Sequence, residues 1–408
     1  MNTGAIAAWQ TGATGRGITV SVVDSGIKRD HQDLAENISP ASTDIIAGRN
    51  QPQGPDRHGT SVSGVIAAAF NGYGTVGVAY NSTILSIRAD VSDCDKPEDT
   101  VCFRGGDLAR ALDYAVQNGA KIINLSLGGE GPLGGAFEAA LQRAINAGVV
   151  FAIASGNEAG ANPEWPGRYA SDPRFAGGII VTGAHNSADQ IADFSNRAGV
   201  SRTYFLSAPG VQIYTDCEGT SCWVANGTSF ASPAVAGALA LLLEAFPNLT
   251  GREAVDILLR TARDAGDQGE DGVYGRGLLD IAQAFQPVGA TRSPQAAGSA
   301  VRVAIEPGAY VGGPFGDAMG RTQALNTIGY DENERLFRID MGAAWRIAPR
   351  RSYQPENPTP MRQSQVTMAG PGGAKLSLVA SAPVATPEPI LNRYTPFDAP
   401  WLGDEMKQ

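Results

Sequence analysis

The amino-acid sequence predicts an α/β fold in which a mostly parallel, doubly wound sheet is covered by helices on both faces. Over residues 1–286, short β-branched runs alternate with segments whose apolar residues keep helical spacing. That order is typical of parallel sheets enclosed between two helix layers. In addition, two segments built almost wholly from small and apolar residues follow His58 and Ser229. A helix that is apolar on every side is normally buried, so both are expected in the interior.

Each expected element rests on its own periodicity. The strands are short runs rich in valine and isoleucine, and the helices repeat apolar residues every three or four positions. Thr250 and Glu253 form a predicted capping box at the start of a further helix. The strands are expected at residues 18–23, 83–87, 121–125, 149–154 and 178–182, and helices at 108–116 and 137–145.

Length and charge limit the class of protein. The chain has 408 residues, a formal net charge of −10 and no long run of like charge. Nucleic-acid binding needs clustered Lys and Arg, so no nucleic-acid partner is expected. The apolar run 234–246 is too short to cross a bilayer, and no membrane span is expected. The length fits one large domain, residues 1–286, followed by a linker and a β-rich, Pro-rich extension, residues 287–408.

The four cysteines form two close pairs, Cys94 with Cys102 and Cys217 with Cys222. Close pairs of this kind are typical of loop disulfides made in an oxidising compartment. A zinc site is the alternative. It is less favoured because neither pair is a Cys-x-x-Cys and no histidine is near in the sequence. No metal site is therefore predicted.

Ser229 is the candidate nucleophile. It lies at the head of the second apolar helix, where unpaired backbone N–H groups carry partial positive charge. Such groups favour an anion that forms beside a reacting serine. The alternative is an ordinary Ser/Thr helix cap followed by a proline in the first turn.

His58 is the credible general base among the three histidines. It begins the first apolar helix, whereas His31 lies among charged residues where local capping or pairing is expected, and His185 lies in a polar loop. Asp24 ends the first strand, at the sheet edge where α/β proteins build their sites. Asp-Ser-Gly is also a common turn. Asn157 follows a later strand and is either a turn residue or a donor to a developing oxyanion.

Four motifs in one order resemble the subtilisin-like serine protease family. The resemblance covers about residues 1–286 and implies a subtilisin-like fold. It also implies that Asp24 orients His58, that His58 takes the proton of Ser229, and that the Asn157 side chain and the Ser229 N–H bind the oxyanion. The motifs are Asp24-Ser-Gly26, His58-Gly-Thr60, Ser155-Gly-Asn157 and Gly227-Thr-Ser229-Phe-Ala-Ser-Pro233.

The same resemblance implies a substrate cleft. Its first edge is Ser126, Leu127 and Gly128, although this sequence is also that of an ordinary strand end. Its second edge, about residues 102–105, includes Phe103 and Arg104. Glu164 is expected near the floor of the pocket for the side chain before the cut, where it would favour basic or polar residues. Alternatively, Glu164 points to solvent or pairs with Arg168.

Two residues depart from the family pattern. Phe230 follows the nucleophile where many members have methionine, which should not abolish activity. Ala234 stands where a histidine is familiar, which is taken as a difference in packing. The family usually folds with an inhibitory propeptide, and residues 1–286 are expected to correspond to the protease without it.

The tail begins with a linker at residues 285–299 and contains Gly313-Pro-Phe-Gly-Asp-Ala318 and the run 330–340. With these segments it resembles the part that follows the protease in bacterial autotransporter subtilases. That resemblance implies a translocator barrel in a longer precursor and a secreted or cell-surface location on a Gram-negative-type bacterium, with the periplasm as an alternative. An unrelated β-rich appendage is the competing interpretation. Strands are expected at residues 301–305, 336–341 and 375–379, with Pro-rich stretches at 354–360 and 383–389.

The favoured function is an exported serine endopeptidase that acts on polypeptides and needs no cofactor for its chemistry; a structural calcium ion is left undetermined. A catalytically idle passenger that binds surface partners is the second hypothesis. An α/β esterase is disfavoured, because Ala231 replaces the second glycine of Gly-x-Ser-x-Gly and the order of the candidate residues is reversed.

Overall fold

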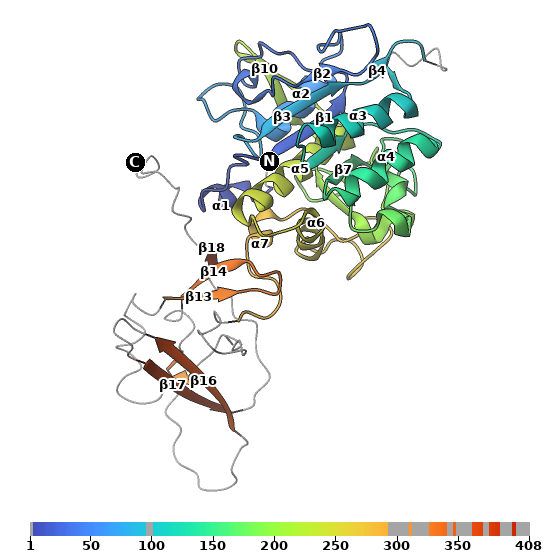
Figure 1. The fold of residues 1–408 in the computed structure, drawn as a ribbon. Helices are drawn as coiled ribbons and strands as arrows, with labels where there is room; N and C mark the ends of the chain where they lie inside the picture. The colour runs from blue at the N-terminus through green and yellow to red at the C-terminus, as the bar shows by residue number, and fades with distance from the viewer. Residues whose placement is uncertain are drawn as a thin grey trace. The chain divides into compact units, whose positions relative to one another are not determined.

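The computed structural model describes residues 3–94, 101–292, 310–311, 326–340, 346–347, 361–369, 375–383 and 394–396. The chain divides into two compact units, Met1–Phe285 and Gln286–Gln408 (Figure 1).

A seven-stranded sheet forms the centre of the first unit, in the order β2-β3-β1-β6-β7-β8-β9. All neighbouring strands pair in parallel. The order reverses at β1, because β3 lies on one side of it and β6 on the other. Ligands of open α/β sheets bind at such a switch point, beyond the carboxyl ends of the strands. The strands are β1 (Thr19–Asp24), β2 (Thr43–Asp44), β3 (Thr83–Arg88), β6 (Ile122–Leu125), β7 (Val150–Ala154), β8 (Ile179–His185) and β9 (Phe205–Pro209).

Helices cover both faces of this sheet. On one face, α3 (Gly105–Gln117) and α4 (Gly135–Asn146) lie side by side and enclose a core with strand residues such as Phe151 (Figure 1). On the other face, α2 (His58–Ala67) and α5 (Thr228–Ala245) pack together, and α5 crosses β6, β7, β8 and β9. The predicted α/β fold is therefore confirmed. The remaining helices are α1 (Ala5–Trp9), α6 (Gly251–Arg260) and α7 (Ile281–Ala284), with 3₁₀ turns at Ala35–Asn37, Gly167–Ser171, Pro173–Phe175 and Gly199–Tyr204.

The five predicted strands are all present, and so is the Thr250–Glu253 capping box. The sequence did not predict β9, β2 or the short pair β4 (Asp90–Val91) and β5 (Cys102–Phe103). Strands β2, β4 and β5 have only two residues each and so show no period. His185 was expected in a polar loop, which is wrong: it ends β8, is 5% exposed and lies 3.2 Å from Ser207 Oγ. Burial lowers the pKa of His185 to about 4.

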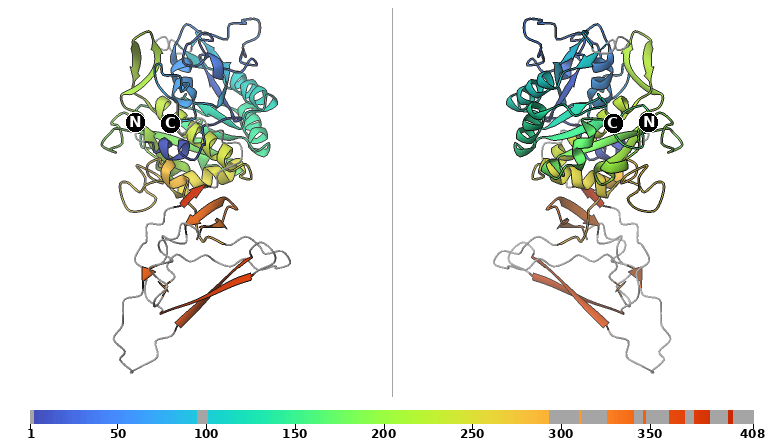
Figure 2. Two further views of the ribbon diagram at one scale, coloured as in Figure 1. Left: turned by 90° about the vertical axis from the view of Figure 1, so that its left-hand side faces the viewer. Right: turned by 90° about the vertical axis from the view of Figure 1, so that its right-hand side faces the viewer.

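The hairpin of β10 (Ile213–Glu218) and β11 (Ser221–Ala225) was also not predicted, because the segment between Cys217 and Cys222 was interpreted only as a disulfide-closed loop. It lies beside α2 (Figures 1 and 2). Strand β11 runs directly into α5, so the hairpin connects the last strand of the sheet to the helix that carries Ser229.

Helix α5 is longer than the apolar run 234–246 suggested. It begins at Thr228, with Gly227 as its cap, and ends at Ala245. Among the described residues it is the one helix whose length and apolarity would let it cross a membrane, and 78% of it is buried inside the protein.

Both cysteine pairs form disulfides. Cys94 bonds to Cys102, which begins β5, and Cys217 bonds to Cys222 across the β10–β11 hairpin. No cysteine is left free. The zinc alternative is therefore wrong, and the bridges close loops as the spacing suggested.

The second unit contains short strands. The predicted strands at 336–341 and 375–379 are present, and the one at 301–305 lies outside the described residues. At the turn between β13 and β14, the buried Arg335 bonds Asp331 at 2.7 Å and lies over the Phe337 ring. The pairs are β12 (Tyr310–Val311) with β15 (Arg346–Ile347), β13 (Asn326–Tyr330) with β14 (Leu336–Asp340), β14 with β18 (Tyr394–Pro396), and β16 (Met361–Ala369) with β17 (Lys375–Pro383).

Candidate active site

Asp24 and His58 meet at the switch point of the sheet. Asp24 is the last residue of β1 and is 1% exposed. Its two carboxylate oxygens lie 2.9 and 3.0 Å from Nδ1 of His58, the first residue of α2. This contact places the imidazole proton on Nδ1 and leaves Nε2 free to accept another.

The first turn of α2 is held against the end of β1 by small residues. The Asp56 side chain accepts the backbone N–H of His58 at 2.9 Å, and the Ser25 hydroxyl accepts that of Gly59 at 3.1 Å. These bonds satisfy donors that a helix start otherwise leaves unpaired. A Cβ atom at Gly59 would collide with the carbonyl oxygen of Gly26, so glycine is required for this approach.

The surroundings of His58 alter its basicity. Burial opposes the charged imidazolium, but the Asp24 carboxylate more than offsets this and, with Asp56, holds the pKa of His58 above its usual range. Below that pKa the imidazole is protonated and cannot accept a proton. The neutral form needed by a general base therefore appears at higher pH than it would for an isolated histidine.

Ser229 is the second residue of α5, not its cap. The cap is Gly227 at φ 152°, and Pro233 lies beyond the first turn, so the ordinary-cap alternative does not describe this helix. Among the described residues, the one hydrogen bond of the Ser229 hydroxyl goes to the Ser126 carbonyl at 3.3 Å. The neighbouring Phe230 ring lies 5.6 Å from the His58 ring.

Pro233 explains a bond that the sequence did not reveal. In an α-helix the carbonyl of residue 229 would accept the N–H of residue 233, which proline lacks. The Ser126 hydroxyl donates to the Ser229 carbonyl instead, at 2.7 Å. Asn124 in turn donates to the Ser126 hydroxyl and accepts from Ser232, both at 2.9 Å. A chain of polar groups thus ties β6 to the first turns of α5.

Asn157 is exposed just beyond β7, and its amide is oriented by Thr228. The Asn157 carbonyl oxygen accepts the backbone N–H of Thr228 at 2.9 Å and its hydroxyl at 3.0 Å. The same hydroxyl accepts the Gly156 N–H at 3.2 Å. With its oxygen engaged, the asparagine is left to donate through Nδ2. This role of Thr228 was not predicted, because its position directly before Ser229 was its only indication in the sequence.

One residue from each expected edge of the substrate cleft belongs to or packs against the same hydrophobic cluster. Ser126 and Leu127 continue β6, and Leu127 belongs to the buried cluster against which Phe103 packs. Gly128 is exposed, and the next residue, Gly129, accepts a bond from the Trp165 backbone at 3.0 Å.

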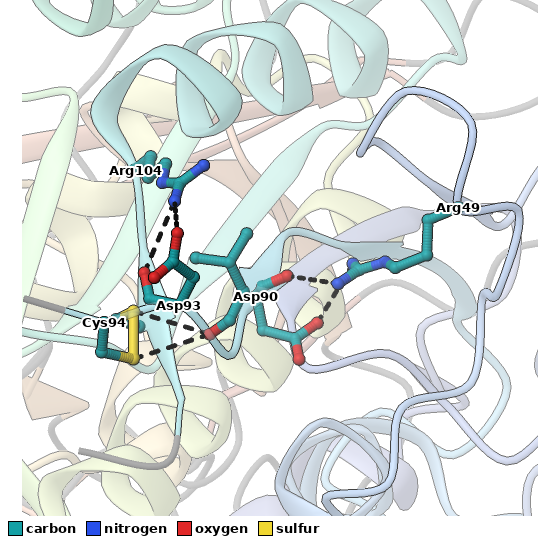
Figure 3. Close-up of a disulfide and its surroundings, with 7 residues drawn as sticks. Arg49, Asp90, Asp93, Cys94 and Arg104 are labelled. Carbon is teal, nitrogen blue, oxygen red and sulfur yellow. Dashed lines mark hydrogen bonds and ion pairs between the residues drawn. A yellow bond between two sulfur atoms is a disulfide. The ribbon is translucent and has the colours of Figure 1, made fainter. Parts of the chain in front are cut away.

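Arg104 is tied to the loop that carries the first disulfide. Its guanidinium lies 3.2 Å from the exposed carboxylate of Asp93 (Figure 3). In the same view, Arg49 reaches the Asp90 carbonyl at 2.6 Å and its carboxylate at 3.3 Å. The segment beside Phe103 and Arg104 is thus held by charged contacts as well as by the Cys94–Cys102 bridge.

Glu164 lies between two glycines. A Cβ atom at Gly128 would collide with Glu164 Oε2, and one at Gly156 would meet Glu164 Cγ at 2.9 Å. Glu164 is partly buried rather than fully exposed. The Arg168 Nε atom donates to the Pro163 carbonyl. Glu164 therefore lies against Gly128, two residues after Ser126, and against Gly156, the residue before Asn157.

Most of the first unit matches a known protein family. The model of the subtilase family matches residues 15–277. The chain belongs to the subtilase family. It is 34% identical over 280 residues to subtilisin from Bacillus pumilus, covering 67% of this chain and 93% of that protein. It is 33% identical to subtilisin NAT from Bacillus subtilis subsp. natto, covering 67% of each, and 33% identical over 277 residues to subtilisin BL from Lederbergia lenta, covering 67% and 93%. The subtilase described here is a serine endopeptidase.

The Ser126–Ser229 hydrogen bond can be tested with a double-mutant cycle. Ser126→Ala should destabilise the protein by about 1–3 kcal/mol, because it leaves the Ser229 carbonyl without a donor. In the Pro233→Ala background the same change should cost less, because the new alanine supplies the missing N–H. Denaturant unfolding of the four variants measures the coupling. An equal cost of Ser126→Ala in both backgrounds would contradict the assignment.

Proposed function

We propose that this subtilase cleaves polypeptides with Asp24, His58 and Ser229 as its catalytic triad. The observation that carries the proposal is the Asp24–His58 contact at 2.9 and 3.0 Å, made at the switch point of the sheet and close to the first turn of α5. A buried carboxylate that holds an imidazole in this way leaves Nε2 as the base.

In the proposed mechanism Ser229 Oγ attacks the scissile carbonyl while His58 Nε2 takes its proton. The tetrahedral intermediate collapses as His58 gives that proton to the leaving amine. Water then attacks the acyl-enzyme by the same route, with His58 again as base, and frees Ser229. The Asp24 carboxylate stabilises the imidazolium at each stage.

The oxyanion is proposed to bind between Asn157 Nδ2 and the backbone N–H of Ser229. Two features support this: Thr228 engages the Asn157 oxygen, and the N–H of the second residue of α5 lies at a helix N-terminus. Donors held in advance of the reaction stabilise charge without reorganising, which is the main benefit of such a site.

The substrate is proposed to lie extended between residues 126–128 and residues 103–104, pairing with their backbone as an added strand. Glu164 would then face the side chain that precedes the cut, since it lies against Gly128 and Gly156. A carboxylate in a partly desolvated pocket favours a basic partner and repels an acidic one. A preference for basic or polar residues before the cut follows.

We propose that the protein acts outside the cytoplasm. The two disulfides support this, because such bonds persist in oxidising compartments. From the resemblance of the tail we further propose that the protein is exported as an autotransporter passenger of a Gram-negative-type bacterium. A longer precursor would then carry the translocator barrel. A catalytically idle passenger is the alternative function.

A serine-directed fluorophosphonate probe tests the catalytic proposal. The wild-type protein should be labelled, and Ser229→Ala should be folded, unlabelled and inactive on a protein substrate. Asp113→Asn, which changes only a partly exposed ion pair with Arg143 between α3 and α4, serves as the labelled control. An unlabelled wild-type protein would support the idle alternative.

Asn157→Ala should lower kcat while KM changes little, because its bond strengthens in the transition state. The expected loss is about 10²–10³-fold, the range known for the oxyanion-hole asparagine of subtilisin itself. Steady-state kinetics on a peptide anilide measures both constants. A change confined to KM would refute the role of Asn157.

The role of Glu164 is tested by comparing kcat/KM for matched peptides with Arg, Leu or Glu before the cut. Arg should be preferred and Glu disfavoured in the wild type, and Glu164→Gly should shift the preference toward Leu. The charge effect is separated from pocket size by Glu164→Gln, which keeps the volume. If Leu exceeds Arg in the wild type and neither variant changes the ratio, the acidic-pocket proposal is wrong.

A further inference from the structure

Asp216 is a charged residue of β10 that is buried to 3% exposure. Its Oδ2 atom accepts hydrogen bonds from Arg57 Nε at 2.7 Å and from Ser61 Oγ at 3.3 Å. Its Oδ1 atom lies 3.0 Å from His31 Nε2. Burying a charge is costly unless it is paired and hydrogen-bonded. These three partners provide that compensation, and they come from two separate segments of the chain.

The backbone of the hairpin is shaped to turn Asp216 toward α2. Successive side chains of a regular strand alternate between its faces. Here the β10–β11 register shifts between Thr215 and Cys217, Asp216 takes φ +48°, and all three residues are buried. The Thr215 hydroxyl donates to the Ser61 carbonyl at 2.7 Å, so consecutive residues bind the same turn of α2. A left-handed backbone is uncommon outside glycine, though Asp tolerates it better than most residues.

His31 completes the arrangement. It is 2% exposed, and its Nδ1 atom accepts the backbone N–H of Asp33 at 3.2 Å. The ring hydrogen therefore lies on Nε2, the atom that faces Asp216. The sequence suggested that His31 caps or pairs locally. That expectation is confirmed at Nδ1, which binds the neighbouring Asp33, whereas the contact of Nε2 with Asp216 on β10 was not predicted.

These contacts join the three segments that carry the proposed triad. His31 lies on the segment that follows Asp24 and β1, Arg57 immediately precedes His58 as the cap of α2, and the hairpin leads into α5 and Ser229. The Cys217–Cys222 bridge closes the hairpin at the residue after Asp216.

We propose that Asp216 is a positioning residue of this protease. By binding Arg57, Ser61 and His31, it sets the first turn of α2 and so the contact of His58 with Asp24. Asp216 touches neither the substrate nor the reacting atoms. The proposal rests on the triad proposed above.

Glu218 provides a matched comparison on the same hairpin. It pairs with Lys28 at 2.6 Å and with Arg57 Nη2 at 3.4 Å, but its side chain is 46% exposed. Exposed ion pairs contribute little, since water already solvates both charges. Arg57 thus has one buried and one exposed carboxylate partner, and only the buried one also bonds the first turn of α2.

The test replaces each carboxylate by its amide. Asp216→Asn should lower kcat by about 10- to 10²-fold with KM nearly unchanged, because a displacement of about 1 Å in a catalytic group can cost that much. The acid limb of kcat/KM should move to lower pH, because a looser contact with Asp24 raises the pKa of His58 less. Glu218→Gln should change neither kcat nor the acid limb.

The outcomes separate positioning from stability alone. If Asp216→Asn lowers the melting temperature but leaves kcat and the acid limb as in the wild type, Asp216 only stabilises the fold and the proposal is wrong. If Asp216→Asn does not fold, Arg57→Gln applies the test at a side chain that is 47% exposed. A wild-type kcat and acid limb in Arg57→Gln would likewise overturn the proposal.

Failure of the triad itself is recognised separately. Fluorophosphonate labelling of the wild type establishes a reactive Ser229 before any variant is compared. If the wild type is labelled and Asp216→Asn is labelled equally fast, the positioning role of Asp216 is wrong but the proposed function stands. If the wild type is not labelled, the proposed function itself is wrong.

Discussion

The contact between Asp24 and His58 depends on how closely α2 approaches the end of β1. The distances of 2.9 and 3.0 Å require the helix to begin directly against the Asp24-Ser-Gly26 turn. Gly59 makes this approach sterically feasible, since any side chain there would meet the Gly26 carbonyl. Ser25 and Asp56 then bind the N–H groups exposed at the helix start. The chemistry of the imidazole is thus a consequence of backbone packing.

The second constraint is the need to satisfy buried polar groups around α5. Pro233 removes a backbone donor, and the Ser126 hydroxyl replaces it. Thr228 engages the oxygen of Asn157 and so directs the amide nitrogen outward. Buried donors and acceptors left unpaired are costly, so each of these bonds also limits how the residues can move. The same hydrogen bonds therefore stabilise the fold and orient the side chains of the candidate site.

Charge is handled differently inside and at the surface. Burial opposes the ionisation of Asp216, but the hydrogen bond from Arg57 and the contact with the His31 ring 3.0 Å away hold its pKa well below the usual range. It therefore remains ionised throughout the pH range in which His58 titrates. Glu218, Lys28 and the outer side of Arg57 remain in water. The hairpin thus presents a permanent buried anion to the helix that carries His58.

The sequence by itself determined the α/β class, the five central strands, the buried helices and the motifs that contain Asp24, His58, Asn157 and Ser229. These are local signals, because periodicity and short motifs are set by neighbours along the chain. Only the tertiary structure decided the partners of His31, the role of Thr228, the replacement of a helix bond by Ser126 and the bulge that turns Asp216 inward. Each of these depends on residues brought together from distant parts of the chain, where a side chain's partner is chosen by packing and by the need to satisfy buried polar atoms.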